Sequence, residues 1–299
     1  ENGLLDDLDH LITQQGEPFG STSVYAQYKV FQTAKASGIK VLLDGQGADE
    51  LFAGYPSHKG ALLAGRLSNF EYLKAARLLA SGTGHSDQGR GYLVKVAGHY
   101  LLPQSLYTTM RNISGEGNRY GWLDLKALCN AGVDIGLEAP IKRGESILHE
   151  ALKHSLSVRS LPQYLRYEDR NSMAHSVEGR VPFLTSKIAE FAYSLPTKYL
   201  ISNSGQTKYL LRKALSGLVP DTILSRNDKV GFQAPLVGLQ EILNRNMYDM
   251  LEQAEKFPWI RVGALRAEWK AIIESNAPYN SKVWRWVNYL KWARIFGVG

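Results

Sequence analysis

One short apolar run, followed by a glycine-rich loop, constrains the fold of this chain more than any other feature. Residues 39–43 read Ile-Lys-Val-Leu-Leu, and the loop at 44–47 reads Asp-Gly-Gln-Gly. A helical pattern at 23–37 ends at Gly38, directly before the run. This order of helix, strand and loop predicts half of a βαβ unit, with a buried parallel strand.

The rest of the chain has the periodicity of helices. Parallel strands need hydrogen-bonded neighbours and helical cover, and no second convincing strand is evident in the sequence. We therefore expect a mainly α fragment of an α/β parent domain, with one or a few short parallel strands. The helical patterns cover 4–12, 70–79, 92–101, 146–156, 161–174, 186–194, 208–215, 236–251, 262–275 and 283–296.

Composition excludes several classes of function. The 299 residues include 44% hydrophobic and 21% charged residues, an ordinary globular balance, and no apolar run is long enough to cross a membrane. The net charge is +7, but the positive residues are scattered rather than clustered. The aromatic residues at 284–296 have helical spacing, which favours a core or docking face over a base-stacking platform. We expect neither a nucleic acid nor a membrane as partner.

The start of the chain and its cysteine content lead to two expectations, one about its length and one about its cellular location. The chain begins at Glu1 with no initiator Met and no signal peptide, which reads as a cut inside a longer protein. Cys129 is the single cysteine, so no internal disulfide can form, and a cytoplasmic location is expected. Its side chain is interpreted as a small buried apolar group.

The loop after the strand is the first candidate site. Gly45 and Gly47 allow the backbone to approach a ligand closely, at the strand end where α/β sheets bind ligands. Asp49 and Glu50 follow, and adjacent carboxylates beside a nucleotide usually serve Mg²⁺. The alternative is a helix N-terminus whose acidic residues interact with the helix dipole.

The second candidate segment spans 165–184. Asp169, Arg170, Glu178 and Arg180 lie among apolar residues there. Charged side chains are rarely buried unless they are paired, so an internal ion-pair network is an equal alternative to a catalytic site.

The third candidate segment spans 224–235. Lys229 is followed by glycine in a polar loop between two helical patterns. Its flexible ammonium group suits a phosphate. A solvated loop lysine is the alternative.

Taken together, these segments resemble the synthetase domain of glutamine-dependent asparagine synthetases, a branch of the ATP-pyrophosphatase fold. The resemblance begins with 8–28, where Glu-Pro-Phe at 17–19 is a family landmark, and continues through 44–55, 169–184 and 220–235. It is weakest over 61–140. It implies an adenine nucleotide alpha hydrolase-like parent domain, with residues 1–299 forming part of the synthetase domain.

The resemblance implies a two-step reaction with ATP, Mg²⁺ and aspartate. ATP activates the aspartate side chain as an acyl-adenylate, and ammonia from a glutaminase domain then displaces AMP to give asparagine. Asp49 would bind Mg²⁺-pyrophosphate and Lys229 would contact phosphate oxygens. The glycines Gly45 and Gly47 would shape the loop at 44–50 around the acyl group.

The remaining family positions would build the wall of the site, and two of them, Glu178 and Arg180, are candidate catalytic residues. Asp169 and Ser172 complete this set.

A homo-oligomer is expected because a strand without its neighbours exposes an edge.

Three departures from the family pattern stand out. Gln46, a further candidate catalytic residue, occupies a position where the family often has an acid that is a candidate for handling the ammonia proton. A neutral amide cannot act as a general base, so either that role moves to another group or this member differs in its nitrogen step. Thr185 stands where an aspartate commonly follows Pro-Phe-Leu. A Ser-Gly-Gly-Leu-Asp-Ser type phosphate loop and a glutaminase domain are not in this sequence, so we expect the isolated chain to be inactive. A related amide- or lactam-forming synthetase and a non-catalytic interaction module remain alternatives.

Overall fold

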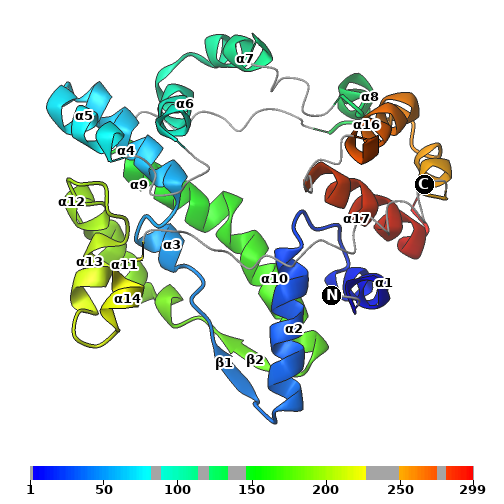
Figure 1. Ribbon diagram of the computed structural model, residues 1–299, viewed down its shortest axis with the longest axis horizontal. Helices are drawn as coiled ribbons and strands as arrows, with labels where there is room; N and C mark the ends of the chain where they lie inside the picture. Colours follow the sequence, from blue (N-terminus) through cyan, green and yellow to red (C-terminus); the bar gives the residue numbers. More distant parts are fainter. Residues whose placement is uncertain are drawn as a thin grey trace.

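The computed structural model describes residues 3–81, 89–113, 121–133, 146–226, 249–274 and 281–298. These ranges are mainly helical, with one sheet of two strands (Figure 1). In chain order the elements are α1 (Gly3–Gln15), α2 (Ser23–Ala36), β1 (Val41–Leu43), α3 (Ala48–Leu51), α4 (Pro56–Ser68), α5 (Tyr72–Ala80), α6 (Arg90–Leu101), α7 (Gln104–Ile113), α8 (Leu125–Asn130), α9 (Ile147–His154), the π-helix η2 (Ser155–Arg159), α10 (Leu161–Ala174), β2 (Glu178–Arg180), the 3₁₀ helix η3 (Pro182–Leu184), α11 (Ser186–Ser194), α12 (Thr197–Leu200), α13 (Tyr209–Ala214), α14 (Asp221–Leu224), α16 (Val262–Glu274) and α17 (Ser281–Phe296).

The helical periodicity of the sequence predicted most of these elements. The expected helices at 161–174 and 186–194 are α10 and α11 with the same bounds. The expected helix at 146–156 instead divides into α9 and the π-helical turn η2. Most of the expected helix at 236–251 lies outside the described residues.

The sheet consists of β1 and β2, which run parallel with Val41 opposite Glu178 and Leu43 opposite Arg180. The predicted parallel strand is therefore confirmed, but its predicted burial is wrong. Val41 is 39% exposed and Leu43 is 73% exposed, because no described element covers that face of the sheet. The other face is covered: Leu42 packs against Phe31, Ala34 and Val177.

A first core joins the two ends of the described chain. It lies between α1, α16 and α17, where Trp284 and Trp286 are buried, which confirms the aromatic run as a core face. The loop at 17–19 is fixed to α17 because Phe19 N donates to Asn288 Oδ1 at 2.7 Å and Trp284 Nε1 donates to Phe19 O at 3.1 Å. Arg166 of α10 also pairs with Glu17.

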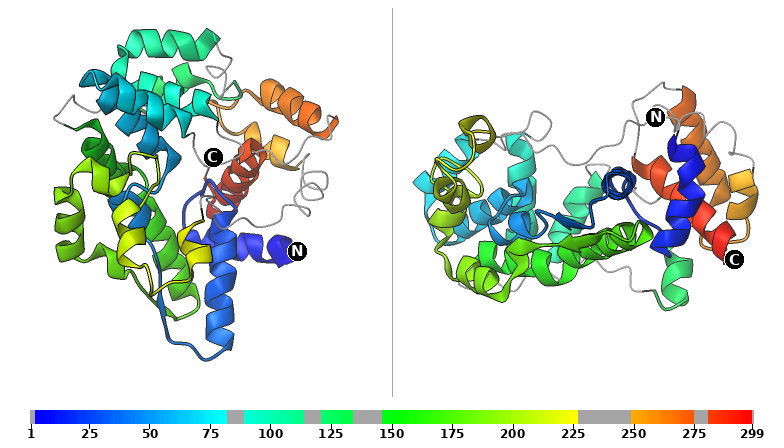
Figure 2. Two further views of the ribbon diagram at one scale, coloured as in Figure 1. Left: turned by 60° about the vertical axis from the view of Figure 1, so that its left-hand side comes forward. Right: turned by 90° about the horizontal axis from the view of Figure 1, so that it is seen from below.

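A second core lies on the opposite side of the molecule. It packs α3, α4, α5, α6, α9, α11 and α12 together through apolar side chains such as Leu63, Leu78, Leu93 and Leu148. Figure 2 shows α9, η2 and α10 as an almost continuous rod that runs from this group toward α1 and α2. α10 contacts η2 at one end and α1 and α2 at the other. This rod therefore connects the two cores.

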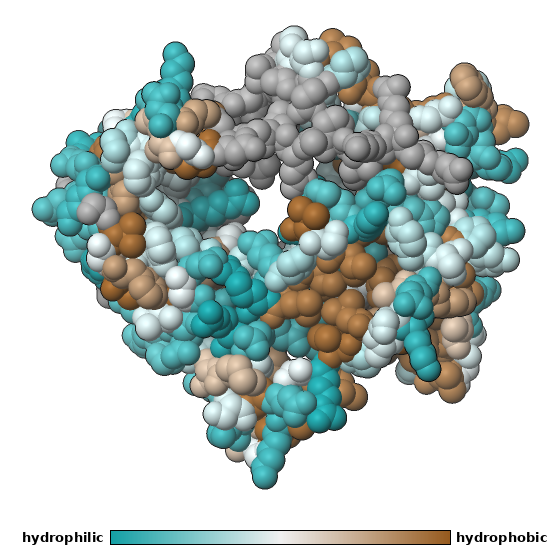
Figure 3. Space-filling model, turned by 180° about the vertical axis from the view of Figure 1, so that it is seen from behind, coloured by the Kyte–Doolittle hydropathy of each residue, from teal (hydrophilic) through white to brown (hydrophobic). Residues whose placement is uncertain are grey.

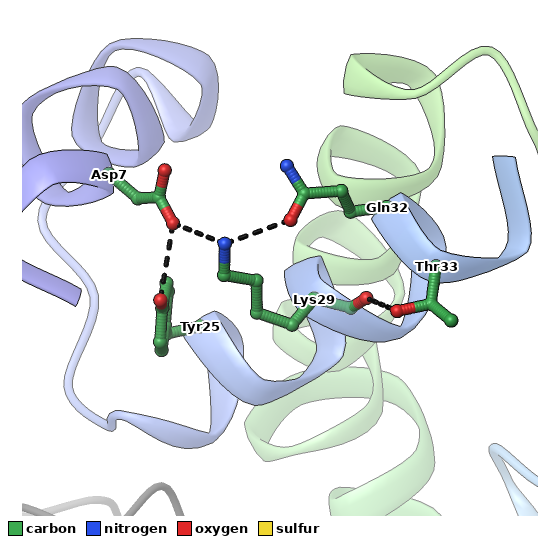
Figure 4. A network of polar contacts seen from close by, with 5 residues as sticks. All are labelled: Asp7, Tyr25, Lys29, Gln32 and Thr33. Carbon is green, nitrogen blue, oxygen red and sulfur yellow. Dashed lines mark hydrogen bonds and ion pairs between the residues drawn. The ribbon is translucent and has the colours of Figure 1, made fainter. Parts of the chain in front are cut away.

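A polar network also holds α1 against α2 (Figure 4). The Asp7 carboxylate accepts a hydrogen bond from Tyr25 Oη at 3.1 Å and pairs with Lys29 Nζ at 2.5 Å. Lys29 also donates to Gln32 Oε1 at 2.8 Å. Burial and the neighbouring Asp7 raise the pKa of Tyr25, so the phenol stays a donor at neutral pH.

The surface bears on two expectations. Cys129 in α8 is exposed, so its interpretation as a buried apolar group is wrong. In the described part of the chain, no helix combines the length and apolarity needed to cross a membrane.

Seen from behind, apolar surface gathers near the middle of the molecule (Figure 3).

Candidate functional site

The loop between β1 and α3 begins where the two parallel strands end. Asp44 N donates to Arg180 O at 2.8 Å, which ties the start of the loop to the end of β2. Gly47 then has φ 86°, and a Cβ added there would lie 2.1 Å from Leu184 Cδ2. This position therefore needs glycine for both its backbone conformation and its space. The resulting loop lies at the carboxyl end of a parallel sheet, where α/β proteins bind ligands.

The Asp49 carboxylate is paired with a lysine from far along the sequence. Lys208 Nζ lies 2.8 Å from Asp49 Oδ1. Lys208 has φ 53°, and its backbone N–H donates to Phe52 O at 3.1 Å. Gly54 packs against both side chains, since an added Cβ would lie 1.6 Å from Asp49 Oδ1. A non-glycine residue in this conformation costs on the order of 1 kcal/mol, and such residues cluster at functional sites.

Glu50 points away from Asp49, into the protein. It is 2% exposed, and its Oε1 accepts a hydrogen bond from Tyr55 Oη at 2.6 Å. Burial and then Glu50 raise the pKa of Tyr55, and burial and then Glu50 also raise that of Tyr164 on α10. The two adjacent carboxylates therefore do not converge on one point, and Glu50 anchors the start of α3 to the protein interior.

Glu168 of α10 is a buried acid beneath the loop. It is 4% exposed, and its Oε2 has no hydrogen-bond partner in the described structure. Burial, followed by the negative charge of Asp44, raises the pKa of Glu168 to about 7, while a side-chain hydrogen bond from Gln46 lowers it. Gly179 of β2 makes room for this carboxylate, because an added Cβ would lie 2.9 Å from Glu168 Oε1.

Our sequence reasoning did not identify Glu168 or Lys208 as functional residues. A signal for Glu168 was present, because it lies seven residues after Leu161 and three after Leu165, on the apolar stripe of a predicted helix. Helical spacing from these leucines does not separate Glu168 from Asp169, which lies four residues after Leu165. The structure buries Glu168 and exposes Asp169. Lys208 had no such signal, because its contact with the loop depends on the tertiary fold.

The four charged residues that we considered at 165–184 do not form an internal ion-pair network. Asp169 and Arg170 are exposed. Glu178 and Arg180 pair at 2.7 Å, but more than half of each side chain is exposed. Their positions on β2 place them on the same open face as Leu43. This alternative is therefore wrong for the four residues.

Three other sequence predictions have different outcomes. Thr185 acts as the N-cap of α11, because its Oγ1 accepts from Ile188 N at 3.4 Å. Ser172 is buried in α10, and its hydroxyl donates to Asp169 O at 3.0 Å. Lys229 lies outside the described residues.

The donor chemistry of the loop fits a magnesium ion bound mainly by its substrate. Mg²⁺ is usually held by one or two carboxylates together with water and nucleotide phosphates. Asp49 supplies one carboxylate, and the described residues hold no group of three or more metal-ligating side chains. A divalent ion at Asp49 would therefore take its other ligands from phosphates and water.

The comparisons with known proteins show the family of the chain. The profile of the asparagine synthase family matches residues 1–294. The chain therefore belongs to the asparagine synthase family, a family that generally uses ATP. No solved structure matches the chain.

Curated relatives from bacteria and a fungus resemble long parts of the chain. The asparagine synthetase [glutamine-hydrolyzing] 1 of Bacillus subtilis is 26% identical, covering 97% of this chain and 46% of its own length. A putative asparagine synthetase of Mycobacterium tuberculosis is 29% identical over 77% of this chain and 35% of its own. The amidase chyE of Penicillium rubens is 26% identical over 77% of this chain and 37% of its own. The chain thus spans between about a third and a half of these relatives.

Proposed function

We propose that this chain is part of an ATP-dependent ligase that converts aspartate to asparagine through a β-aspartyl-adenylate, with ammonia supplied from glutamine. Family membership supports the reaction class. The observation that carries the proposal is the Glu168 carboxyl, which is buried under the loop at 44–47 with its Oε2 unpartnered among the described residues; burial and the charge of Asp44 raise its pKa to about 7.

In this proposal the activation step uses the loop and its neighbours. Gly45 and Gly47 let the backbone approach the acyl group closely. Asp49 would hold Mg²⁺, which supplies positive charge to the phosphates when bound. Lys229 would meet the negative charge that grows as pyrophosphate leaves. These groups position the substrates and stabilise charge, and no covalent enzyme intermediate is needed.

The nitrogen step requires a proton acceptor, since ammonia loses a proton as it forms the amide. Gln46 cannot take that proton because its side chain is a neutral amide. Glu168 lies beside Gln46, has one carboxylate oxygen without a partner, and has a pKa of about 7. A general base is most effective when its pKa lies near the working pH. We assign the proton to Glu168, with Gln46 orienting the carboxylate.

The outer wall of the site comes from β2 in this proposal. Glu178 and Arg180 lie on the open face of the sheet and pair with each other at 2.7 Å. They would contact a substrate that binds over that face. Glu50 would act indirectly, by holding α3 through its hydrogen bond with Tyr55.

The two steps can be measured separately in the full-length protein. ATP–pyrophosphate exchange that depends on aspartate reports activation, and ammonia-dependent asparagine formation reports the nitrogen step. Exchange without amide formation in Gln46→Ala would support a role for the loop in the nitrogen step. A protein that shows neither reaction with aspartate would contradict the proposal.

A second candidate is the formation of an amide on a different carboxylate. It is favoured by the similarity to the amidase chyE, a relative that is named an amidase and not an asparagine synthetase. Screening a panel of amino and keto acids in the exchange assay would separate the two candidates. Exchange with another carboxylate, but not with aspartate, would favour this second function.

A further inference from the structure

A separate pocket lies between α4, α5, the start of α9 and the start of α12. Its volume is about 300 Å³. Figure 1 places these four elements in the group of helices that contains the second core. The polar residues that line it include Arg66, Asn69, Lys74, Thr197, Lys198 and Asn203. None of these residues belongs to the loop site, so the pocket is a feature of its own.

Arg66 is the unusual member of this lining. Arg66 is only 6% exposed. Its guanidinium donates to Lys74 O at 2.9 Å and, in a long contact, to Asn203 Oδ1 at 3.5 Å. Both acceptors are neutral, and no carboxylate among the described residues forms an ion pair with Arg66 within 4.0 Å. The guanidinium therefore has donors to spare.

The one acid among the lining residues is already paired. Glu71 pairs with Lys74 Nζ at 2.6 Å. Glu71 raises the pKa of Arg66 by its charge, but burial has the larger effect and lowers it. An arginine nevertheless stays protonated in proteins. The pocket thus contains a buried cation that forms no ion pair with any residue the structure describes, and buried charges are normally paired.

The rest of the lining has the same electrostatic sign. Arg66, Lys74 and Lys198 are opposed by Glu71 alone among the lining residues. The first turn of α9 also lines the pocket, and a helix N-terminus carries partial positive charge. Asn69, Thr197 and Asn203 add neutral groups that can donate hydrogen bonds.

We propose that this pocket binds a small oxyanion, a phosphate or carboxylate group carried by a metabolite, with Arg66 as its anchor and Lys198 at its entrance. A guanidinium presents parallel N–H donors that match two oxygens of either group. The pocket volume accommodates such a group together with a small carrier. Because a ligand that binds the folded state stabilises it, occupancy raises the unfolding temperature.

The test is thermal unfolding of the protein at constant ionic strength in chloride, inorganic phosphate or succinate. We expect a saturable rise of several degrees with at least one of the two oxyanions, and the arm that saturates identifies the group. Lys198→Gln should weaken the apparent affinity about tenfold. Arg66→Met keeps the apolar stem and should abolish the rise. Lys153→Gln, an exposed lysine of α9 outside the pocket, is the matched control and should behave like wild type.

Each outcome of the unfolding experiment either supports or overturns the inference. No saturable rise in either oxyanion overturns the inference, as does an undiminished rise in both Arg66→Met and Lys198→Gln. If Arg66→Met does not fold, Lys198→Gln and Asn203→Ala decide by the same measurement. The inference does not depend on the proposed ligase function, since a protein inactive with aspartate can still show the oxyanion effect.

Discussion

Replacing Glu168 by glutamine tests the proposed nitrogen step and the electrostatics of the site together. The substitution keeps the size of the side chain and removes its ionisation. In the folded protein the pKa of Glu168 is raised from an ordinary value of 4.5 to about 7, with burial as the largest cause. Ionised Glu168 is therefore unfavourable in the folded state, and the size of that penalty follows from the shift.

The expected stability effect has a definite sign. Below about pH 4.5 the carboxyl is protonated whether folded or unfolded, and it carries no penalty. Between pH 4.5 and 7 the unfolded chain loses its proton first, so wild-type stability falls as pH rises. Above pH 7 the penalty is constant, at up to ~3 kcal/mol. Glu168→Gln should therefore be more stable than wild type at pH 8 and equally stable at pH 4.

The expected activity effect is separate from stability. Amide formation by the wild type should rise with pH through about pH 7, as the carboxyl ionises. In Glu168→Gln that rise should disappear and the rate should fall about 10²–10⁴-fold, the usual contribution of a general base. ATP–pyrophosphate exchange should stay within about tenfold of wild type, because activation precedes the proton transfer.

The measurements are denaturant unfolding from pH 4 to 8 and the two activity assays over the same range. Glu190→Gln is the matched control, since Glu190 is an exposed glutamate on α11. Equal stability of Glu168→Gln and wild type at pH 8 would refute the raised pKa. Equal losses of exchange and amide formation would assign Glu168 to positioning the loop rather than to accepting a proton.

Three further predictions concern the rest of the site. In Gly54→Ala the new Cβ would displace Asp49 Oδ1 and Lys208 Cε, which lie 1.6 and 2.6 Å from its ideal position. The Mg²⁺ concentration needed for half-maximal exchange should therefore rise about tenfold or more, because Asp49 would hold the ion less well. Circular dichroism should show that the fold is kept. Lys229→Ala should lower exchange about 10²–10³-fold in a folded protein, and near-normal exchange would return this residue to the solvated-loop alternative. Leu43→Thr should reduce self-association of the purified chain, measured by light scattering across concentration, because Leu43 is 73% exposed on the open face of the sheet; unchanged association would exclude that face as the contact.

Several helices were predictable because their apolar stripes are local, whereas α4 and α7 were not among the expected ranges. α10 and α11 have the bounds that the periodicity indicated. β1 was also predictable, from an apolar run before glycines. β2 was not, because Glu-Gly-Arg has no strand pattern and becomes a strand only by pairing with β1. A strand defined by its neighbour cannot be recognised from its own residues.

The site was predictable only in part, for a related reason. The motif at 44–50 identified the loop, and the structure places it at the end of the parallel strands. The direction of each side chain depends on segments far along the chain. Asp49 meets Lys208, and Glu50 meets Tyr55, so two neighbouring acids face different surroundings. Our sequence analysis treated them as one pair, since it had no information on these contacts.

The contrast between Glu168 and the Glu178–Arg180 pair shows which charges can act at this site. The exposed pair is screened by water, and each member already satisfies the other, so it exerts little field on a bound substrate. Glu168 is buried, unpaired at Oε2 and close to the loop, where low polarity strengthens every electrostatic interaction. Among the described residues, the charged neighbour that shifts its pKa is Asp44, which has the same sign. A positive charge beside these two acids would relieve that repulsion. The nitrogen of the attacking ammonia becomes positive as it bonds to the acyl carbon, so the same arrangement that raises the pKa of Glu168 also stabilises the intermediate whose proton its carboxylate accepts.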